Sequence, residues 1–212
     1  MILEIIQILV LFVLPVLLVY YKTIPFKYRI HTLAIVTLST FAVILIEGWT
    51  LIDLGIRIDT LGKYFLPYII FTLTLAMFLI VLARLLKRRG QENFFRRKRF
   101  IYIAVISSIS QELMFRGYLF AKLYEMTSNY YIIILINALL FAFIHVIYSN
   151  TPLTLFMIFI AGICFASMYW AYPNLILLII SHTILNYIAV HYGFFYEGRK
   201  KIAGVGKISF EI

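Results

Sequence analysis

Several ionisable side chains lie within stretches of this sequence that are otherwise almost free of charge. Glu112 and Arg116 stand four residues apart, His182 and Asn186 repeat this spacing, and His145 lies in a third apolar stretch. Residues four apart share one face of an α-helix, and an ionisable group inside a bilayer costs at least about 2.5 to 3.5 kcal/mol on insertion scales. Each group taken alone suits a buried ion pair or a hydrogen-bonded packing residue. Together they predict one polar site shared by three helices.

A glutamate, two histidines and an asparagine are sufficient for peptide hydrolysis without a covalent intermediate. A carboxylate takes a proton from water and passes it to a leaving amine, an imidazole shares the activation of the water, and a second histidine with an amide donates hydrogen bonds to an oxyanion. A metal version is also open, in which His145, His182 and Glu112 hold a divalent ion such as zinc. The spacing does not demand zinc, because asparagine is a poor zinc ligand and the sequence has no HExxH motif.

Seven apolar stretches must position these residues. Of the 212 residues, 64% are hydrophobic and 13% are charged, and the mean hydropathy of +0.99 excludes an ordinary soluble domain. A spanning helix needs about 20 mostly apolar residues. Such windows lie at about 2–21, 32–50, 65–86, 100–123, 130–148, 153–171 and 174–191. We predict an all-α, polytopic transmembrane helical bundle with about seven spanning helices.

The chain is expected to form a single membrane domain over residues 1–212, because nothing between the apolar stretches is long enough for a second folded domain. Its expected parts are the amino-terminal spans with a basic loop (1–99), a core (100–191) and a basic cytoplasmic tail (192–212).

The basic residues predict the orientation of this bundle. The formal charge is +10, and 15 of the 19 Lys and Arg residues close or follow the first, third and seventh apolar stretches. They are Lys22, Lys27, Arg29, Arg84, Lys87, Arg88, Arg89, Arg96, Arg97, Lys98, Arg99, Arg199, Lys200, Lys201 and Lys207. With seven spans these groups share one side, so the positive-inside rule places the amino terminus outside and the carboxyl terminus in the cytoplasm.

This orientation predicts where the polar site opens and which partners it meets. At about 1.5 Å per residue, Glu112 and His182 fall roughly mid-membrane and His145 lies nearer the cytoplasmic face. The site should therefore open toward the cytoplasm. A basic run such as 96–99 suits nucleic acid or anionic lipid, but an orientation signal at the membrane surface is the simpler interpretation. Membrane lipids are expected partners, and nucleic acid is not.

Three motifs in series resemble those of the CPBP family, the CAAX proteases and bacteriocin-processing enzymes. The segments QELMFRG (111–117), FAFIH (141–145) and HTILN (182–186) are similar in order and spacing to the family's EExxxR, FxxxH and HxxxN/D motifs. The resemblance covers about 100–191. It implies an intramembrane endopeptidase that cleaves near the C-terminus of a membrane-tethered protein, such as a prenylated CAAX protein in the type II CAAX prenyl endopeptidases.

The resemblance also implies roles for the matching residues. Glu112 matches the second glutamate of the first motif, and His145 matches the histidine thought to activate water with a glutamate. His182 and Asn186 match the pair that binds an oxyanion or a metal. The supporting residues by motif position are Arg116 and Phe141. The family has been called both metalloprotease and glutamate protease, so the metal stays open.

One position departs from the family pattern, because the first glutamate of EExxxR is Gln111 here. An amide has no useful basicity near neutral pH. Three explanations compete: Glu112 serves as the base although adjacent helix positions point about 100° apart, the chain is an inactive relative that only binds a membrane partner, or a Glu to Gln exchange was introduced to trap an inactive form. An ion conductor is the weakest alternative, because we find no repeat symmetry or broken helices.

Overall fold

A computed structural model describes residues 2–88, 90, 98–147 and 151–194, and in these residues it contains helices and no strand. The helical segments are α1 (Ile2–Ile8), η1 (Leu9–Val13), α2 (Leu14–Tyr20), η2 (Phe26–Tyr28), α3 (Arg29–Ile46), α4 (Leu61–Leu85), α5 (Lys98–Glu112), η4 (Leu113–Leu119), α6 (Phe120–Met126), α7 (Tyr130–Ile144), η5 (His145–Ile147), α8 (Pro152–Ala171) and α9 (Leu175–His191). The predicted all-α fold is confirmed.

These segments join into helices that follow the predicted apolar stretches. The α1, η1 and α2 segments are continuous, as are α5, η4 and α6. Among the described residues, five helices are long and apolar enough to cross a membrane: Ile2–Tyr20, Phe26–Ile46, Leu61–Leu85, Tyr130–Ile147 and Pro152–Ala171. With α9 as a shorter apolar helix, the chain is built as an integral membrane protein. The full count of seven spans and the orientation stay predictions.

The second helix lies earlier in the chain than its apolar window. Pro25 precedes the 3-10 turn η2, which leads directly into α3. The helix ends at Ile46 because Gly48 adopts a left-handed conformation with a φ of +73°, which stops a helix at low steric cost. The predicted end near residue 50 is therefore wrong by about one helical turn.

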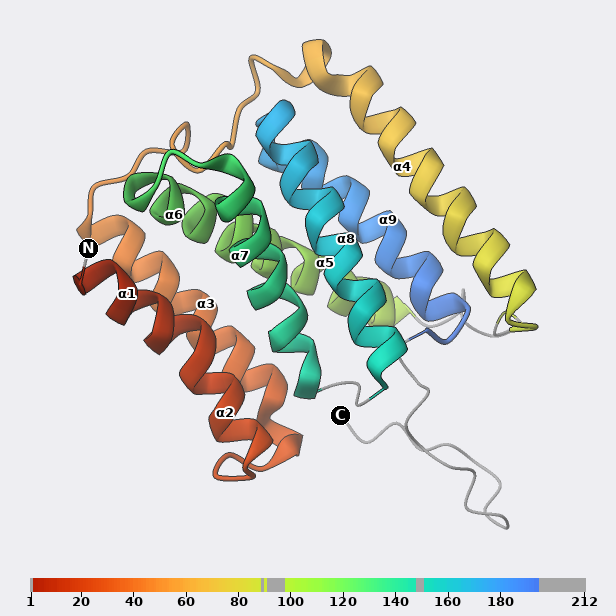
Figure 1. The fold of residues 1–212 in the computed structure, drawn as a ribbon, viewed down its shortest axis with the longest axis horizontal. Helices are drawn as coiled ribbons and strands as arrows, with labels where there is room; N and C mark the ends of the chain where they lie inside the picture. The colour runs from red at the N-terminus through yellow and green to blue at the C-terminus, as the bar shows by residue number, and fades with distance from the viewer. Residues whose placement is uncertain (1, 89, 91–97, 148–150, 195–212) are drawn as a thin grey trace.

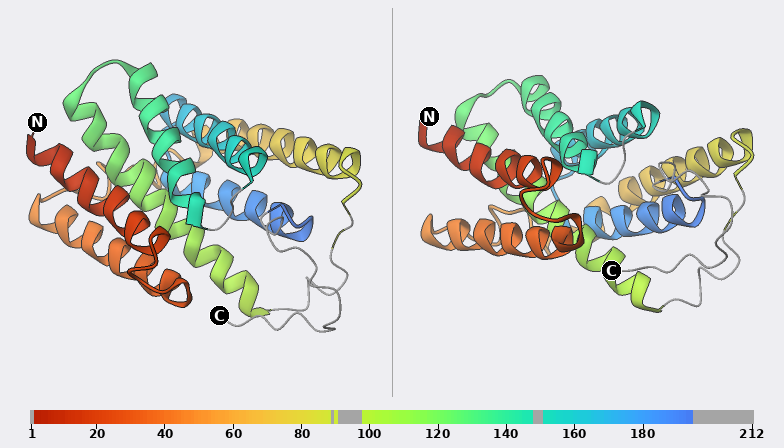
Figure 2. Two further views of the ribbon diagram at one scale, coloured as in Figure 1. Left: turned by 60° about the horizontal axis from the view of Figure 1, so that its bottom comes forward. Right: turned by 90° about the horizontal axis from the view of Figure 1, so that it is seen from below.

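The α5–η4–α6 rod crosses the middle of the bundle (Figures 1 and 2). The hairpin of α1–α2 and α3 lies on one side of it, and α4 and α9 lie on the other. The α7 and α8 helices pack along each other, and α9 contacts both α4 and α5. On the hairpin side, the Phe12 ring meets the Phe115 ring with centroids 5.1 Å apart. The rod therefore contacts most other elements and is surrounded by them.

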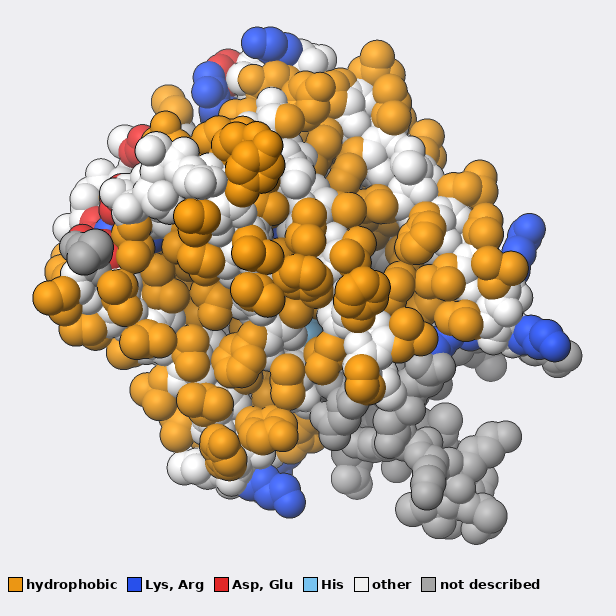
Figure 3. All heavy atoms as spheres, viewed as in Figure 1, with side chains coloured by type: hydrophobic (Ala, Val, Ile, Leu, Met, Phe, Trp, Pro, Cys, Tyr) orange, Lys and Arg blue, Asp and Glu red, His pale blue; other side chains and the backbone are white. Residues whose placement is uncertain are grey.

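Apolar side chains cover most of the outer surface shown in Figure 3. Large hydrophobic residues of α3 and α4 are exposed, including Leu38 at 68% and Leu66 at 64%. In water such a surface would be an aggregation liability, whereas lipid tails match it. Several polar and charged residues are buried inside the bundle instead, among them Glu112 and Arg116.

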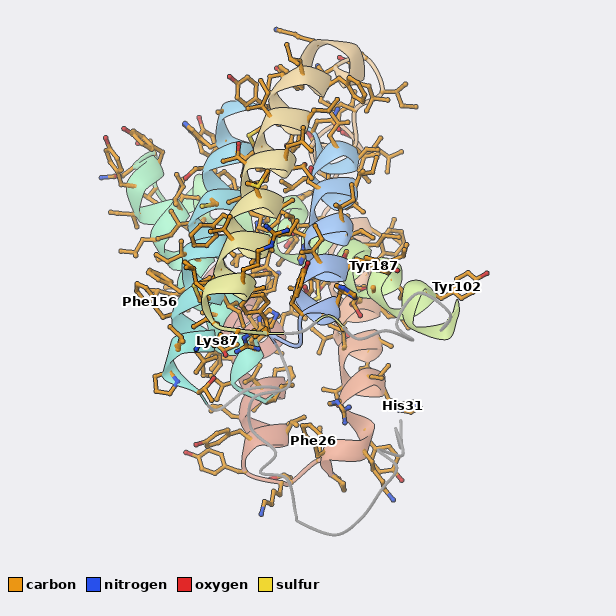
Figure 4. The ribbon with its side chains drawn as sticks, turned by 90° about the vertical axis from the view of Figure 1, so that its right-hand side faces the viewer. Phe26, His31, Lys87, Tyr102, Phe156 and Tyr187 are labelled. Carbon is orange, nitrogen blue, oxygen red and sulfur yellow. The ribbon has the colours of Figure 1, made fainter. Side chains whose placement is uncertain are left out.

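The basic residues of the first two groups lie at one end of the bundle. Lys27 lies in η2 between α2 and α3, and Arg29 is the first residue of α3. The α4 helix ends just before Lys87. Figure 4 shows Lys87, His31 and Phe26 toward this end. The Arg88 Nη1 atom donates to the Gly193 oxygen after α9 at 2.8 Å, so α4 and α9 finish together. The side chains at 89 and 96–99 and the tail from 195 to 212 lie outside the described part.

One asparagine fixes the start of α9 and so the depth of the helix that carries His182. The Asn174 side chain accepts from Leu177 N at 3.0 Å, as an N-cap does. Its Nδ2 atom donates to the Arg57 oxygen at 2.7 Å and to Thr60 Oγ1 at 2.9 Å. The loop between α3 and α4 is therefore tied to the end of α9.

The close approach of α7 and α8 depends on a glycine. A Cβ atom added at Gly162 would lie 3.0 Å from the Ala138 Cα and 3.2 Å from its Cβ. Since one neighbour is backbone, a side chain at this position requires the two helices to move apart.

We predict that Gly162→Ala lowers the free energy of unfolding by about 1 to 3 kcal/mol, the usual cost of overpacking. Denaturant unfolding of the protein in detergent measures this change. Gly62→Ala in α4 is the matched control, because nothing lies within 4 Å of a Cβ there and alanine favours helices over glycine. Equal stability of the two variants would contradict this account of the α7–α8 contact.

Candidate active site

A buried glutamate connects two helices at the centre of the bundle. Glu112 is the last residue of α5, and its Oε1 atom contacts His182 Nδ1 of α9. The same oxygen accepts from Arg116 Nη1 at 3.2 Å. Glu112 and Arg116 have no exposed surface, and His182 is 3% exposed. The structure thus brings three of the predicted site residues into one cluster.

The cluster lies at the start of a π-helical stretch. The η4 segment begins directly after Glu112 and contains Arg116. Such wide turns are often found at functional sites. Asn137 of α7 donates through Nδ2 to the Phe115 oxygen inside this stretch at 2.6 Å. Asn137 therefore fastens the backbone that carries Arg116 to α7.

Arg116 is held by groups from two other helices, α7 and α8, as well as by Glu112. Its Nη2 atom donates to the Gly162 oxygen of α8 at 3.2 Å. Its guanidinium lies 4.6 Å from the Phe141 ring centroid and 5.5 Å from that of Phe165, distances at which a cation is attracted to a ring face. The two aromatic rings therefore lie beside the guanidinium, and the Gly162 carbonyl accepts one of its N–H groups.

His182 is packed between two of these rings and anchored by its neighbour in sequence. Its ring centroid lies 4.9 Å from Phe165 and 5.9 Å from Phe141. The adjacent Ser181 accepts from Thr72 Oγ1 of α4 at 2.7 Å and donates to the Leu177 oxygen at 3.0 Å. The imidazole therefore has little freedom to turn away from Glu112.

His145 approaches the cluster from the end of α7. Its Nδ1 atom lies 2.7 Å from the Phe141 oxygen. Because a carbonyl oxygen only accepts, Nδ1 carries the proton and Nε2 carries the lone pair in the neutral ring. The Phe141 ring lies 4.9 Å from the His145 ring, so Phe141 contacts both imidazoles.

The remaining motif residues are placed differently. Asn186 lies one turn beyond His182, partly exposed, and its Nδ2 donates to Ser108 Oγ at 3.3 Å. Gln111 is 8% exposed and lines a separate apolar cavity with residues of α1–α2, α3 and η5. Its Oε1 atom is buried and has no hydrogen-bond partner among the described residues. Gln111 and Glu112 thus face different surroundings.

The donors at this site do not form the three-ligand arrangement that a zinc ion requires. Among the described residues, no group of three or more His, Cys, Asp or Glu side chains is arranged to hold a metal ion. Glu112 and His182 contact each other directly, and His145 turns Nδ1 to a backbone oxygen. The predicted zinc set of His145, His182 and Glu112 therefore does not fit this geometry.

Asn137 and Gly162 support the site but do not belong to the residues predicted from the sequence. Asn137 leaves a weak signal, because it is the only amide in the apolar helix from 130 to 144. Gly162 leaves no signal in the sequence, because it acts through its backbone oxygen, which accepts from Arg116. The packing of α8 against α7 at this glycine is seen only in the structure.

One known family matches the part of the chain that carries the three motifs. Residues 94–188 match the model of the type II CAAX prenyl endopeptidase Rce1-like family. The match contains all three motifs and supports the resemblance of this segment to the CPBP family. No curated protein and no solved structure matches the chain.

We predict that Arg116→Leu lowers the free energy of unfolding by about 3 to 5 kcal/mol, because it leaves the Glu112 charge buried without its partner. Adding Glu112→Gln should recover part of this loss, and a double-mutant cycle in detergent measures the coupling. Arg57→Leu is the control, since the Arg57–Asp59 pair has side chains 34% and 63% exposed and should contribute little. A double variant as unstable as Arg116→Leu alone would contradict the pairing argument.

Proposed function

We propose that this chain is an intramembrane endopeptidase that hydrolyses a peptide bond near the C-terminus of a membrane-tethered protein. A prenylated CAAX tail is the first candidate substrate, because the matching family is that of type II CAAX prenyl endopeptidases. The observation that carries the proposal is the contact between the buried Glu112 carboxylate and His182. A carboxylate bonded to one imidazole nitrogen orients the ring as a base, as in hydrolase triads.

In the proposed reaction the histidines, and not residue 111, activate water. With a proton on Nδ1 facing Glu112, the Nε2 atom of His182 takes a proton from water as the water oxygen attacks the peptide carbonyl carbon. His145, whose proton is also on Nδ1, offers a second Nε2 atom. The tetrahedral intermediate then loses its amine as the C–N bond breaks, and the proton on the imidazole passes to the leaving nitrogen.

Asn186 is the proposed oxyanion donor. Its Nδ2 atom is held by Ser108 one helical turn from His182. Amide donors placed where negative charge develops stabilise such intermediates. Since Asn186 and His145 both lie toward the basic end, we propose that substrate enters from that end, which the positive-inside rule assigns to the cytoplasm.

Gln111 supports a second candidate function, a non-catalytic scaffold that binds a membrane partner. Its cavity is lined mainly by apolar residues, including Leu11, Val16 and Leu33, and its amide cannot act as a base. In this alternative the cavity holds an apolar segment of the partner, and no bond is cleaved.

Cleavage of a farnesylated, quenched fluorescent CAAX peptide by the full chain in nanodiscs tests both functions. We expect cleavage by the wild type, and a fall in kcat of at least about 100-fold in His182→Ala and in His145→Ala, the usual contribution of a general base. His31→Ala is the matched control, because His31 is an exposed residue near the start of α3. Its kcat should match the wild type.

The Gln111→Glu variant separates the two functions. If the wild type is inactive and Gln111→Glu cleaves the peptide, the chain is a scaffold with an otherwise competent site. If neither cleaves any member of a lipidated peptide panel, while circular dichroism shows folded protein, the endopeptidase proposal is wrong.

Removal of metal ions gives a further prediction for the active chain. Because the carboxylate and imidazoles do not form a three-ligand group, we expect the cleavage rate to be unchanged after dialysis against EDTA or 1,10-phenanthroline. Loss of cleavage that added zinc restores would contradict the histidine-based reaction.

A further inference from the structure

A second cavity, of about 570 Å³, lies away from the residues of the proposed reaction that handle water. It is lined by residues of η4, α6 and α8 and of the loop after α3. The α6 helix and the C-terminal end of α8 lie at the end of the bundle opposite the basic one (Figure 1). Its walls include Trp49, Asp53, Phe120, Tyr124, Glu125 and Trp170. The cavity is thus rich in aromatic rings and carries two carboxylates.

The aromatic rings form a continuous wall. The Trp170 ring centroid lies 6.1 Å from that of Phe120 and 6.0 Å from that of Tyr124. Trp170 is 40% exposed and Tyr124 is 56% exposed. An incoming group can therefore contact these rings without disturbing the core.

Charge around the cavity is negative. Lys122 Nζ lies 2.8 Å from Glu47 and 3.2 Å from Glu125. One ammonium group is thus paired with two carboxylates, and Asp53 adds a third carboxylate. Asp53 accepts from Thr50 Oγ1 at 2.6 Å and from Thr50 N at 2.8 Å, and these bonds lower the pKa of its carboxyl. Asp53 is therefore ionised at neutral pH.

The protein already places one ammonium group against another ring that lines the cavity. Lys122 Nζ lies 5.1 Å from the Trp49 ring centroid, within the range of a cation–π contact. Arg116 reaches the floor of the cavity, but Glu112 balances its charge. The site therefore has the ring faces and the negative charge that attract a second organic cation.

We propose that this cavity binds the ammonium headgroup of a zwitterionic membrane lipid. Aromatic rings combined with carboxylates recognise alkylammonium groups, and the cavity opens where apolar helices end, at the depth of lipid headgroups. The adjoining loop exposes Leu51 at 61%, Ile52 at 66% and Ile58 at 77%, which suits contact with the lipid interface. This proposal does not require that the chain cleaves peptides.

The sequence contains two tryptophans, Trp49 and Trp170, and both line the cavity. Tryptophan fluorescence of the full chain in maltoside detergent therefore reports on this site. Titration with tetramethylammonium chloride should give a saturable change in emission. Sodium chloride at equal ionic strength and neutral 3,3-dimethylbutanol should give none. A response that does not saturate, or an equal response to the neutral compound, would overturn the proposal.

Variants and lipids complete the test. The Asp53→Asn, Glu125→Gln double variant should weaken tetramethylammonium binding about tenfold, whereas Asp59→Asn, on the same loop but outside the cavity lining, should not change it. In nanodiscs, phosphatidylcholine should occupy the site and abolish the response that phosphatidylglycerol nanodiscs retain. Unchanged binding in the double variant, or equal responses in both lipids, would contradict recognition of a lipid headgroup.

Discussion

The Glu112 carboxylate is the group on which the rest of the structure depends, because a charge in an apolar interior must be paired. Arg116 and His182 supply its partners from η4 and α9. Arg116 in turn requires the Gly162 oxygen of α8 and the ring of Phe141 on α7. Breaking a buried ion pair costs far more than the pair contributes when intact. One carboxylate therefore sets the relative positions of four elements.

The same ion pair separates two chemically different cavities. Gln111 lines the apolar cavity beside the first hairpin, and Arg116 reaches the floor of the aromatic, acidic cavity at the opposite end. The surfaces of the two ends differ in the same sense, since Lys27 and Arg29 lie at one end and Asp53 and Glu125 at the other. A helix bundle with one polar centre thus presents two distinct environments to the membrane surfaces.

Much of this arrangement follows from the sequence, because charge is scarce in it. Apolar windows predict the helices, and the few ionisable residues inside them include Glu112, Arg116 and His182, which the structure brings together. Asn137 and Gly162 could not be assigned in the same way. The partner of Asn137 is a carbonyl in a π-helix, which a period of 3.6 residues does not reveal, and the role of Gly162 depends on where α8 packs.

The amide at position 111 has an electrostatic consequence that favours a histidine-based reaction. Glu112 and Arg116 neutralise each other in a fully buried pair, so a second carboxylate next to Glu112 would add an unbalanced charge to the interior, at a cost of several kcal/mol by order of magnitude. Gln111 avoids this cost and leaves the contact between Glu112 and His182 intact. In the proposed reaction, basicity then lies in the imidazoles, whose neutral forms are cheaper to bury than a carboxylate.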